Sequence, residues 1–268
     1  MVKKVWIFDN EGKASQETSK KLKELLLREP ELTLDEKNPE IIISIGGDGT
    51  MLSAFQKYQE QTDKIQFVGV HTGHLGFYTD FLSTELNKLI QVLRAEKIEE
   101  SVRYPLLSVK VHFENEDVLC YYALNEATVR RGIETLRAEV EISDFSFEKF
   151  RGDGLVVSTP TGSTAYNKSV GGAVIHPRVE AMQMAEIASI NNRVFRTLGS
   201  AMIVAKKDNI IIYPEENQKI FITIDQNEFY MENIKKVTFS LDGKTIAFAS
   251  RAHIPFWERV KNSFIGEG

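Results

Sequence analysis

The sequence predicts two domains. The first is an amino-terminal α/β domain with a doubly wound, mostly parallel sheet, and the second is a carboxy-terminal, β-rich, sandwich-like domain. Residues 1–100 alternate apolar strands with helices, and residues 101–251 carry mostly short strands. The tail, 252–268, is apolar enough to require a surface to cover it. We therefore expect an α/β domain at 1–100 and a β-rich domain at 101–251, with the tail docking back on the first domain.

The elements of the first domain follow from its apolar pattern. The run Ile41 to Ile45 is nearly all β-branched and hardly alternates, which is typical of a central parallel strand covered on both faces. A helix that starts near Ser15 should end before Pro30, since the residue before a proline disfavours the helical conformation. Further strands are expected at 5–8 and 65–70, and further helices after Gly49 and near Ser83.

The second domain shows strand alternation from Leu107 to Phe113. One helix is expected at 180–189, and Asp242-Gly243 predicts a hairpin between 237–241 and 245–249. The tail from Pro255 to Ile265 has helical spacing. The other expected strands are 118–129, 136–142, 155–158, 210–213 and 220–224.

Composition excludes several classes of protein. The net charge of −5 lacks the basic surplus of a general nucleic-acid binder. The start of the chain is too polar for a signal peptide, and no apolar run reaches the ~20 residues of a spanning helix. Cys120 is the single cysteine and is expected to be a buried, inert thiol. We expect a cytoplasmic protein with neither nucleic acid nor membrane as a partner.

The segment Gly46-Gly47-Asp48-Gly49-Thr50 directly follows the buried strand and opens a helix. Glycines let the backbone approach a ligand, and amides at a helix start bind phosphate. The spacing matches neither a Walker A loop nor the dinucleotide fingerprint. Asp48 could hold Mg²⁺ or accept a proton from an attacking hydroxyl. The alternative is an ordinary strand-to-helix turn in which Asp48 caps backbone amides.

Two later segments supply further polar groups. Asn125-Glu126, near a strand end, pairs an amide with a carboxylate, which suits ribose hydroxyls. Residues 151–172 begin with Arg151 and Asp153, and then carry hydroxyl residues around Gly162, an aromatic ring and a lysine. This composition fits a nucleotide cradle, and its alternative is a long surface loop. His71 and His74 are three residues apart, but the glycines around them favour a turn over a metal pair.

The chain resembles the NAD kinases, and among them the bacterial type. The matching segments are 46–50, 70–77, 124–126, 151–172, 188–193 and 255–257. The resemblance implies transfer of the γ-phosphate of ATP, or of polyphosphate, to the 2′-hydroxyl of the adenosine ribose of NAD, giving NADP. It implies a divalent cation, with Mg²⁺ held mainly by substrate phosphates and not by a protein metal site. It also implies a homodimer or homotetramer, with NAD in the crevice between the two domains.

The resemblance also assigns roles to residues. Asp48 would orient and deprotonate the accepting hydroxyl, Glu126 would bind ribose hydroxyls, and Arg151 would face phosphate. Ala188 matches a position that can approach NAD from a neighbouring subunit, and Gln226 stands where some relatives carry histidine. The positions implied to contact NAD or ATP are Gly46, Gly47, Gly49, Thr50, Phe77, Asn125, Glu126, Arg151, Asp153, Ser158, Thr164, Ala165, Tyr166, Asn167, Lys168, Ser169, Ala188 and Gln226.

Two rival functions remain open at this point. Lipid kinases of the diacylglycerol or sphingosine type share the Gly-Gly-Asp-Gly loop, but residues 151–172 resemble the NAD kinases specifically. A nucleotide-binding sensor without turnover would retain the pocket, but Asp48 is intact. Asp48 does not discriminate against the lipid kinases, but Asp48→Asn is expected to abolish turnover while leaving NAD binding largely intact.

Overall fold

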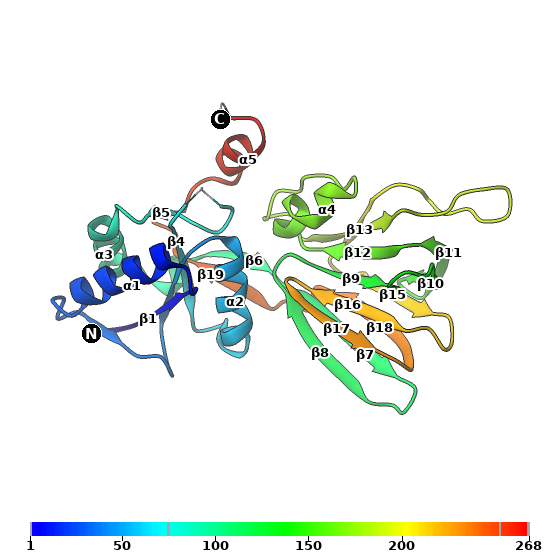
Figure 1. The fold of residues 1–268 in the computed structure, drawn as a ribbon, viewed down its shortest axis with the longest axis horizontal. Coiled ribbons are helices and arrows are strands. Elements are labelled where there is room, and N and C mark those ends of the chain that lie inside the picture. Colours follow the sequence, from blue (N-terminus) through cyan, green and yellow to red (C-terminus); the bar gives the residue numbers. More distant parts are fainter. Residues whose placement is uncertain (1, 74–75, 252, 267–268) are drawn as a thin grey trace. The chain divides into compact units, whose positions relative to one another are not determined.

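The computed structural model describes residues 2–73, 76–251 and 253–266 and divides into two compact units (Figure 1). The α/β unit comprises residues 1–104 and 245–268, and the β unit comprises residues 105–244. The chain thus passes between the units after Tyr104 and after Lys244, where boundaries after residues 100 and 251 were expected. Residues 245–251 belong to the α/β unit because they include a strand of its sheet.

The sheet of the α/β unit has the strand order β2-β1-β3-β4-β19-β6, and β5 pairs with β4. The pairs from β2 through β19 are parallel, as the alternation of strands and helices predicts. The strands are β1 (Lys3–Asp9), β2 (Leu32–Leu34), β3 (Ile41–Ile45), β4 (Gln66–His71), β5 (Phe81–Leu82), β6 (Val102–Pro105) and β19 (Thr245–Phe248).

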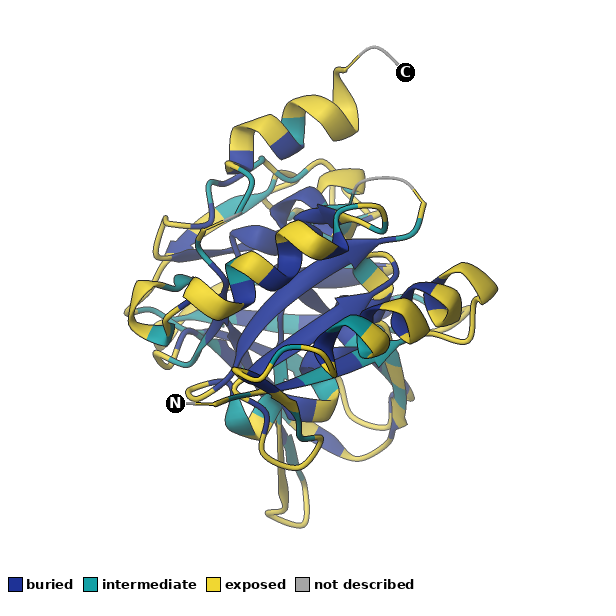
Figure 2. Cartoon of the chain, turned by 90° about the vertical axis from the view of Figure 1, so that its left-hand side faces the viewer, coloured by how far each residue is buried: buried dark blue, intermediate teal, exposed yellow. Residues whose placement is uncertain are grey.

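Helices cover this sheet, and Figure 2 shows its buried strands in dark blue beneath helices with exposed outer faces. Leu22 of α1 and Leu89 of α3 share one hydrophobic core with alternate residues of β1, β3 and β4. All five residues of β3 are buried, as expected for a central strand. The helices are α1 (Lys13–Leu26), α2 (Asp48–Tyr58), α3 (Leu86–Ala95) and α5 (Phe256–Phe264), with 3-10 turns η1 (Gln59–Gln61) and η2 (Ile98–Glu100).

The β unit contains two six-stranded sheets, ordered β11-β10-β15-β18-β7-β8 and β14-β13-β12-β9-β16-β17. The first sheet comprises β7 (Leu107–Phe113), β8 (Val118–Ala123), β10 (Leu136–Ile142), β11 (Phe145–Gly152), β15 (Ile210–Pro214) and β18 (Ile234–Ser240). The second comprises β9 (Glu126–Arg130), β12 (Gly154–Ser158), β13 (Ala181–Ile187), β14 (Met202–Ala205), β16 (Ile220–Ile224) and β17 (Asn227–Met231). The turn η3 (Thr161–Thr164) and the short helix α4 (Tyr166–Ser169) follow β12.

Both sheets of the β unit are antiparallel and contribute to one hydrophobic core. Val109 and Phe239 from the first sheet and Val129 and Met184 from the second belong to the same buried cluster. Two sheets that enclose a shared core form a β-sandwich. The predicted fold class is therefore confirmed for both halves of the chain.

Three local predictions were wrong. Residues 181–187 form strand β13, although Ala, Met, Gln and Glu favour helices, because this segment pairs with β12 and β14 in the sheet. Asp242-Gly243 does not close a hairpin: β18 stays in the β unit, whereas β19 pairs with β4 in parallel. Turn residues specify a change of direction but not the strand that pairs next. Cys120 is exposed, because β8 lies at a sheet edge.

Candidate active site

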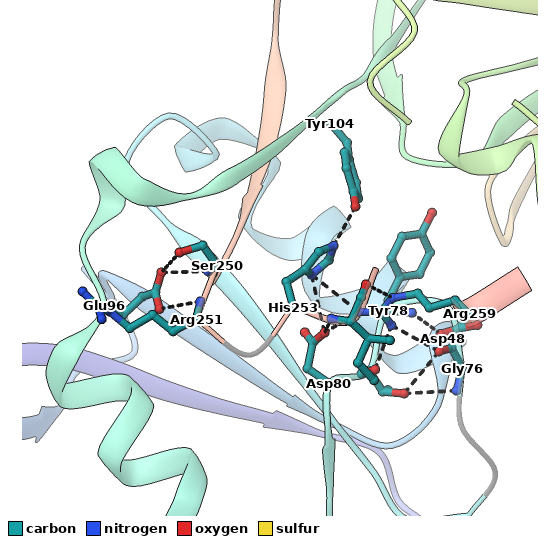
Figure 3. Close-up of polar contacts among 12 residues, drawn as sticks. Asp48, Gly76, Tyr78, Asp80, Glu96, Tyr104, Ser250, Arg251, His253 and Arg259 are labelled. Atoms are coloured by element: carbon teal, nitrogen blue, oxygen red, sulfur yellow. Dashed lines mark hydrogen bonds and ion pairs between the residues drawn. The ribbon is translucent and has the colours of Figure 1, made fainter. Parts of the chain in front are cut away.

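The Asp48 side chain lies at the start of α2, immediately after the carboxyl end of the central strand β3. Its carboxylate accepts two backbone hydrogen bonds, from Phe77 N to Oδ2 at 2.9 Å and from Tyr78 N to Oδ1 at 2.8 Å (Figure 3). A carboxylate has about four acceptor positions, so both oxygens can still accept a hydrogen bond from a ligand. The local backbone thus fixes the direction of a half-buried carboxylate that retains acceptor capacity.

The glycine loop around Asp48 is tightly packed on one side. Gly46 has φ +153°, and a Cβ there would lie 2.2 Å from Thr50 Oγ1 and 2.8 Å from Asn10 Nδ2. The Asn10 amide donates to Thr50 Oγ1 at 3.0 Å, which ties the end of β1 to the loop. Gly47 and Gly49 are exposed, and a Cβ at Gly47 would meet no described atom within 4 Å. The exposed side is therefore open to the close approach of a ligand.

The segment 76–80, which supplies the amides that bind Asp48, is also tightly packed. A Cβ at Gly76 would lie 2.3 Å from Asp48 Oδ1, so only glycine fits against the carboxylate. The Phe77 ring contacts two aromatic rings of α5, with centroid distances of 6.4 Å to Phe256 and 5.7 Å to Phe264. Of the histidine pair, His71 Nδ1 lies 3.0 Å from the Gly73 carbonyl, whereas His74 lies outside the described residues.

In the β unit, the backbone at Asn125-Glu126 is held from two sides. The Asp225 carboxylate accepts hydrogen bonds from the amides of Leu124, Asn125 and Glu126, at 2.9, 2.7 and 3.3 Å. Asp225 occupies the left-handed region at φ +52°, a conformation that aspartate tolerates better than most residues. From the other side, the Thr159 hydroxyl donates to the Leu124 carbonyl at 2.7 Å.

The loop after β12 packs directly onto that backbone. A Cβ at Gly162 would lie 2.0 Å from the Asn125 carbonyl oxygen, so glycine is required by close approach. The Gly162 amide donates to Thr159 Oγ1 at 2.9 Å, which closes the loop onto the strand end. Gly162 thereby packs against the predicted residue Asn125, and both Asn125 and the predicted Thr164 are buried.

The Glu126 carboxyl group is buried, with 8% of the residue exposed. Burial, followed by the negative charge of Asp225, raises the pKa of Glu126 to about 8, although a hydrogen bond from the Tyr166 amide opposes this shift. Among the described residues, Oε2 of Glu126 has no hydrogen-bond partner. A buried, unpaired carboxyl oxygen costs free energy, so it indicates a position that a ligand or water completes.

Asn167 repeats this pattern on α4. The residue is fully buried, and neither its Oδ1 nor its Nδ2 has a hydrogen-bond partner in the described part of the chain. The Ser158 hydroxyl, opposite Glu126 in the register of β9 and β12, is likewise buried without one. Ala165, Tyr166, Lys168 and Ser169 lie at the exposed or half-exposed edge of α4, and Tyr166 is 36% exposed.

Four predicted residues have different surroundings. Arg151 is in β11, with its guanidinium carbon 4.1 Å from the centroid of the Phe195 ring, and it lines a cavity of about 880 Å³ with residues of β10, β11, β15 and 194–196. Asp153 is exposed between β11 and β12, Ala188 is exposed at φ +47°, and Gln226 is exposed in the turn before β17. The lining of the Arg151 cavity includes none of the other predicted site residues.

Sequence reasoning missed several residues that shape these sites. The Asn10 side chain donates a hydrogen bond to the Thr50 hydroxyl, and the Asp225 carboxylate accepts one from the Asn125 amide. Asp80 and Arg259 form a buried ion pair beside the segment 76–80. Burial raises the pKa of Asp80, but hydrogen bonding to His253 and the charge of Arg259 outweigh it, so the net pKa is lowered. The sequence signal that could have identified Arg259 is its position three residues after Phe256, on the same face of the predicted tail helix.

No group of three or more His, Cys, Asp or Glu residues is arranged to hold a metal ion within 2–73, 76–251 and 253–266. No helix in the described part of the chain is both long enough and apolar enough to span a membrane.

The two units therefore present complementary chemistry, each within its own fold. The α/β unit holds an oriented carboxylate at a glycine-rich helix start, where a phosphate or a hydroxyl can be bound. The β unit holds buried amide, hydroxyl and carboxyl groups with unused hydrogen-bonding capacity. Such a set suits a polar ligand with many hydroxyl and ring-nitrogen groups.

Comparison with known proteins agrees with this chemistry. The chain matches the models of the ATP-NAD kinase N-terminal domain over residues 9–98 and of the ATP-NAD kinase C-terminal domain over residues 124–241. The NAD kinase of Lactococcus lactis subsp. cremoris (strain MG1363) is 54% identical over 265 residues, covering 99% of this chain and 98% of that protein. The NAD kinase of Streptococcus gordonii is 52% identical over 266 residues, covering 99% and 96%.

Solved structures show the same fold. Yeast NADH kinase complexed with NADH superposes with a TM-score of 0.82 at 19% identity, covering 99% of this chain and 88% of that one. An NAD kinase from Archaeoglobus fulgidus in complex with ATP gives a TM-score of 0.73 at 23% identity, covering 97% of each chain. Both domain models match in order and the relatives align over nearly the whole length, so the chain belongs to the NAD kinase family and is an enzyme of that family.

Proposed function

We propose that the chain transfers the γ-phosphate of ATP to the 2′-hydroxyl of the adenosine ribose of NAD, with Asp48 as the catalytic residue. The observation that carries this proposal is the Asp48 carboxylate, oriented by the Phe77 and Tyr78 amides at the start of α2. The donor is supported by the description of the matched family and by the ATP complex of the Archaeoglobus fulgidus enzyme.

Phosphoryl transfer requires little covalent chemistry from a protein. The reacting groups must be aligned and the developing charge must be stabilised. The 2′-hydroxyl attacks the γ-phosphorus, the bond from that phosphorus to the bridging oxygen breaks, and ADP leaves. The Asp48 carboxylate accepts the hydroxyl proton, a role that typically contributes ~10²- to 10⁴-fold to the rate.

The β unit supplies the binding groups for NAD in this proposal. Asn125 and Asn167 offer amide donors and acceptors, and Glu126 offers its unpaired Oε2 to ribose hydroxyls. The structure of yeast NADH kinase complexed with NADH is consistent with a dinucleotide ligand for this fold. The role of Arg151 in facing phosphate and the roles of Ala188 and Gln226 stay predictions.

We propose that Mg²⁺ is bound chiefly through the phosphates of ATP. Mg²⁺ usually keeps several waters and is bound largely through substrate phosphates, so Asp48 stays available as the proton acceptor. When bound, the ion neutralises negative charge on the phosphates. Polyphosphate as a donor, the homodimer or homotetramer, the cytoplasmic location and the crevice between the domains likewise stay predictions.

The deciding experiment incubates purified protein with NAD, ATP and Mg²⁺ and detects NADP with an NADP-specific dehydrogenase. We expect turnover that is lost on chelation of Mg²⁺ and lost in Asp48→Asn, while NAD binding measured by calorimetry persists. NAD binding without NADP formation would instead identify a sensor. Near-normal turnover of Asp48→Asn would show that Asp48 is not the base.

A further inference from the structure

The carboxy-terminal helix α5 contacts the segment that orients Asp48. Both oxygens of the Asp48 carboxylate accept hydrogen bonds from consecutive amides, Phe77 N and Tyr78 N. A rotation of either peptide plane therefore rotates the carboxylate. Whatever fixes the backbone of residues 76–80 consequently fixes the direction of Asp48.

Arg259 of α5 binds this segment through both terminal nitrogens of its guanidinium group (Figure 3). Nη1 donates to the Thr79 carbonyl at 2.8 Å and lies 3.4 Å from the Gly76 carbonyl, and Nη2 donates to Asp80 Oδ1. Nε donates to the Ile254 carbonyl at 3.1 Å, which anchors the guanidinium to the chain before α5. The carbonyls thus lie on both sides of the two amides that hold Asp48.

The Arg259 contact is buried and charged. Arg259 is 2% exposed, and the Asp80 side chain also accepts a hydrogen bond from the Ile254 amide at 3.1 Å. His253 Nδ1 lies 3.4 Å from Asp80 Oδ1, and its Nε2 lies 2.6 Å from the Tyr104 hydroxyl. Desolvation largely cancels the attraction within a buried ion pair, so such a pair is weak evidence for stability alone. The effect of this pair is therefore mainly on geometry, because a planar guanidinium holds several hydrogen-bond acceptors in fixed positions at once.

Aromatic packing of α5 acts on the same segment. Phe77, whose amide binds Asp48, has its ring against Phe256 and Phe264, one on each side of Arg259 along α5. The helix therefore contacts the segment 76–80 through one guanidinium and two rings. Ordinary docking of an apolar helix requires the rings but not the guanidinium.

We propose that Arg259, paired with Asp80, is a positioning residue for phosphoryl transfer: it holds the 76–80 backbone so that the Phe77 and Tyr78 amides aim the Asp48 carboxylate. This inference rests on the proposed catalytic role of Asp48. Arg259 acts through the 76–80 backbone and does not itself touch the reacting atoms. Misplacing a catalytic group by ~1 Å can cost ~10²-fold in rate, so the expected effect is on kcat.

The test compares Arg259→Lys with Arg251→Ala in the full-length enzyme. Lysine retains the charge but cannot donate to Thr79, Asp80 and Ile254 together. We expect kcat to fall ~10- to 100-fold with KM for NAD and ATP changed less than ~3-fold. Arg251 is exposed and pairs with Glu100 on the surface, so Arg251→Ala should leave kcat unchanged.

Chemical rescue distinguishes positioning from general destabilisation. Added methylguanidinium should restore part of kcat to Arg259→Ala but none to Asp48→Asn, since only the former lacks a guanidinium. A folded Arg259→Lys with parental kcat, or an Arg259→Ala whose loss is not reduced by methylguanidinium, would overturn the proposal. If Arg259→Lys does not fold, Arg259→Gln takes its place, with the same expected loss of kcat. Near-normal turnover by Asp48→Asn would refute the catalytic role of Asp48, independently of the result for Arg259.

Discussion

Asp48 in the α/β unit and Glu126 in the β unit are both acids implied to contact NAD, and the protein surrounds their carboxyl groups in opposite ways. Asp48 is half-buried, and backbone amides engage both of its oxygens. Glu126 is buried, its Oε2 has no partner among the described residues, and burial beside Asp225 raises its pKa to about 8. The first carboxylate is oriented before any ligand arrives, whereas the second is left incomplete.

This difference separates two uses of an acid. A group that accepts a proton during the reaction benefits from a fixed side-chain orientation, because aligning the reacting groups is part of the activation free energy. A group that binds a ligand benefits from hydrogen-bonding capacity that only the ligand satisfies. A buried polar atom without a hydrogen-bond partner costs free energy, and ligand binding removes that cost. This contrast agrees with the proposed roles of Asp48 as the proton acceptor and of Glu126 as a ligand-binding group.

The largest expected contrast comes from the same acid-to-amide change at both positions. Asp48→Asn should lower kcat by at least ~100-fold, because an amide cannot take the proton and its NH₂ would face a backbone N–H. Glu126→Gln should change kcat and the NAD dissociation constant at pH 7 by less than ~3-fold, because the raised pKa already keeps the carboxyl largely protonated. Steady-state kinetics measures kcat, and calorimetry measures the NAD dissociation constant. An equal loss of kcat in the two variants would contradict the comparison.

A second prediction perturbs the orientation of Asp48 without changing the acid. Gly76→Ala places a methyl group 2.3 Å from Asp48 Oδ1 and must rotate the carboxylate or move the segment. We expect kcat to fall ~10- to 100-fold while the fold persists. Gly73→Ala is the matched control in the same region, since a Cβ there meets no described atom within 4 Å. Parental kcat in Gly76→Ala would mean that the direction of the carboxylate is unimportant.

A third prediction concerns the support beneath Glu126. Asp225→Ala removes the acceptor of three backbone amides at 124–126, so we expect a loss of ~1–3 kcal/mol in the free energy of unfolding. Thermal unfolding should shift by ~2–4 °C for each kcal/mol. NAD affinity should fall as well, because the Asn125 and Glu126 backbone is no longer fixed. An unchanged unfolding temperature would show that water replaces the carboxylate.

The last prediction concerns the pH dependence of stability and not the rate of the reaction. Glu126 has a folded pKa raised from 4.5 to about 8, so between these values the folded state retains a proton that the unfolded state has lost. Its contribution to stability is complete below pH ~4.5 and is lost as the pH rises to ~8. The ligand-free parent should therefore lose more thermal stability than Glu126→Gln between pH 5 and 8, on the order of 10 °C, as measured by calorimetric scans. Parallel curves would exclude the raised pKa.

The sequence alone determined the fold class and predicted the chemistry of the sites. The unbroken apolar run at 41–45, followed by Gly46 to Thr50, specified a buried strand, a glycine turn and a helix start, all of which the structure contains. The family was identified from the ordered motifs and is confirmed by the two matched domain models. Asp48, Asn125 and Glu126 stood out because polar residues at strand ends carry a local signal.

The tertiary structure decided what depends on partners distant in the chain. Strand β19 joins β4 across about 180 residues, β13 is a strand despite its helical composition, and Asp225 reaches back about 100 residues to the Glu126 backbone. Arg259 binds Thr79 and Asp80 in the same long-range way. Local propensity and residue spacing do not predict contacts between residues so far apart in the chain. Which residues hold Asp48 in place therefore becomes visible only when the chain is folded.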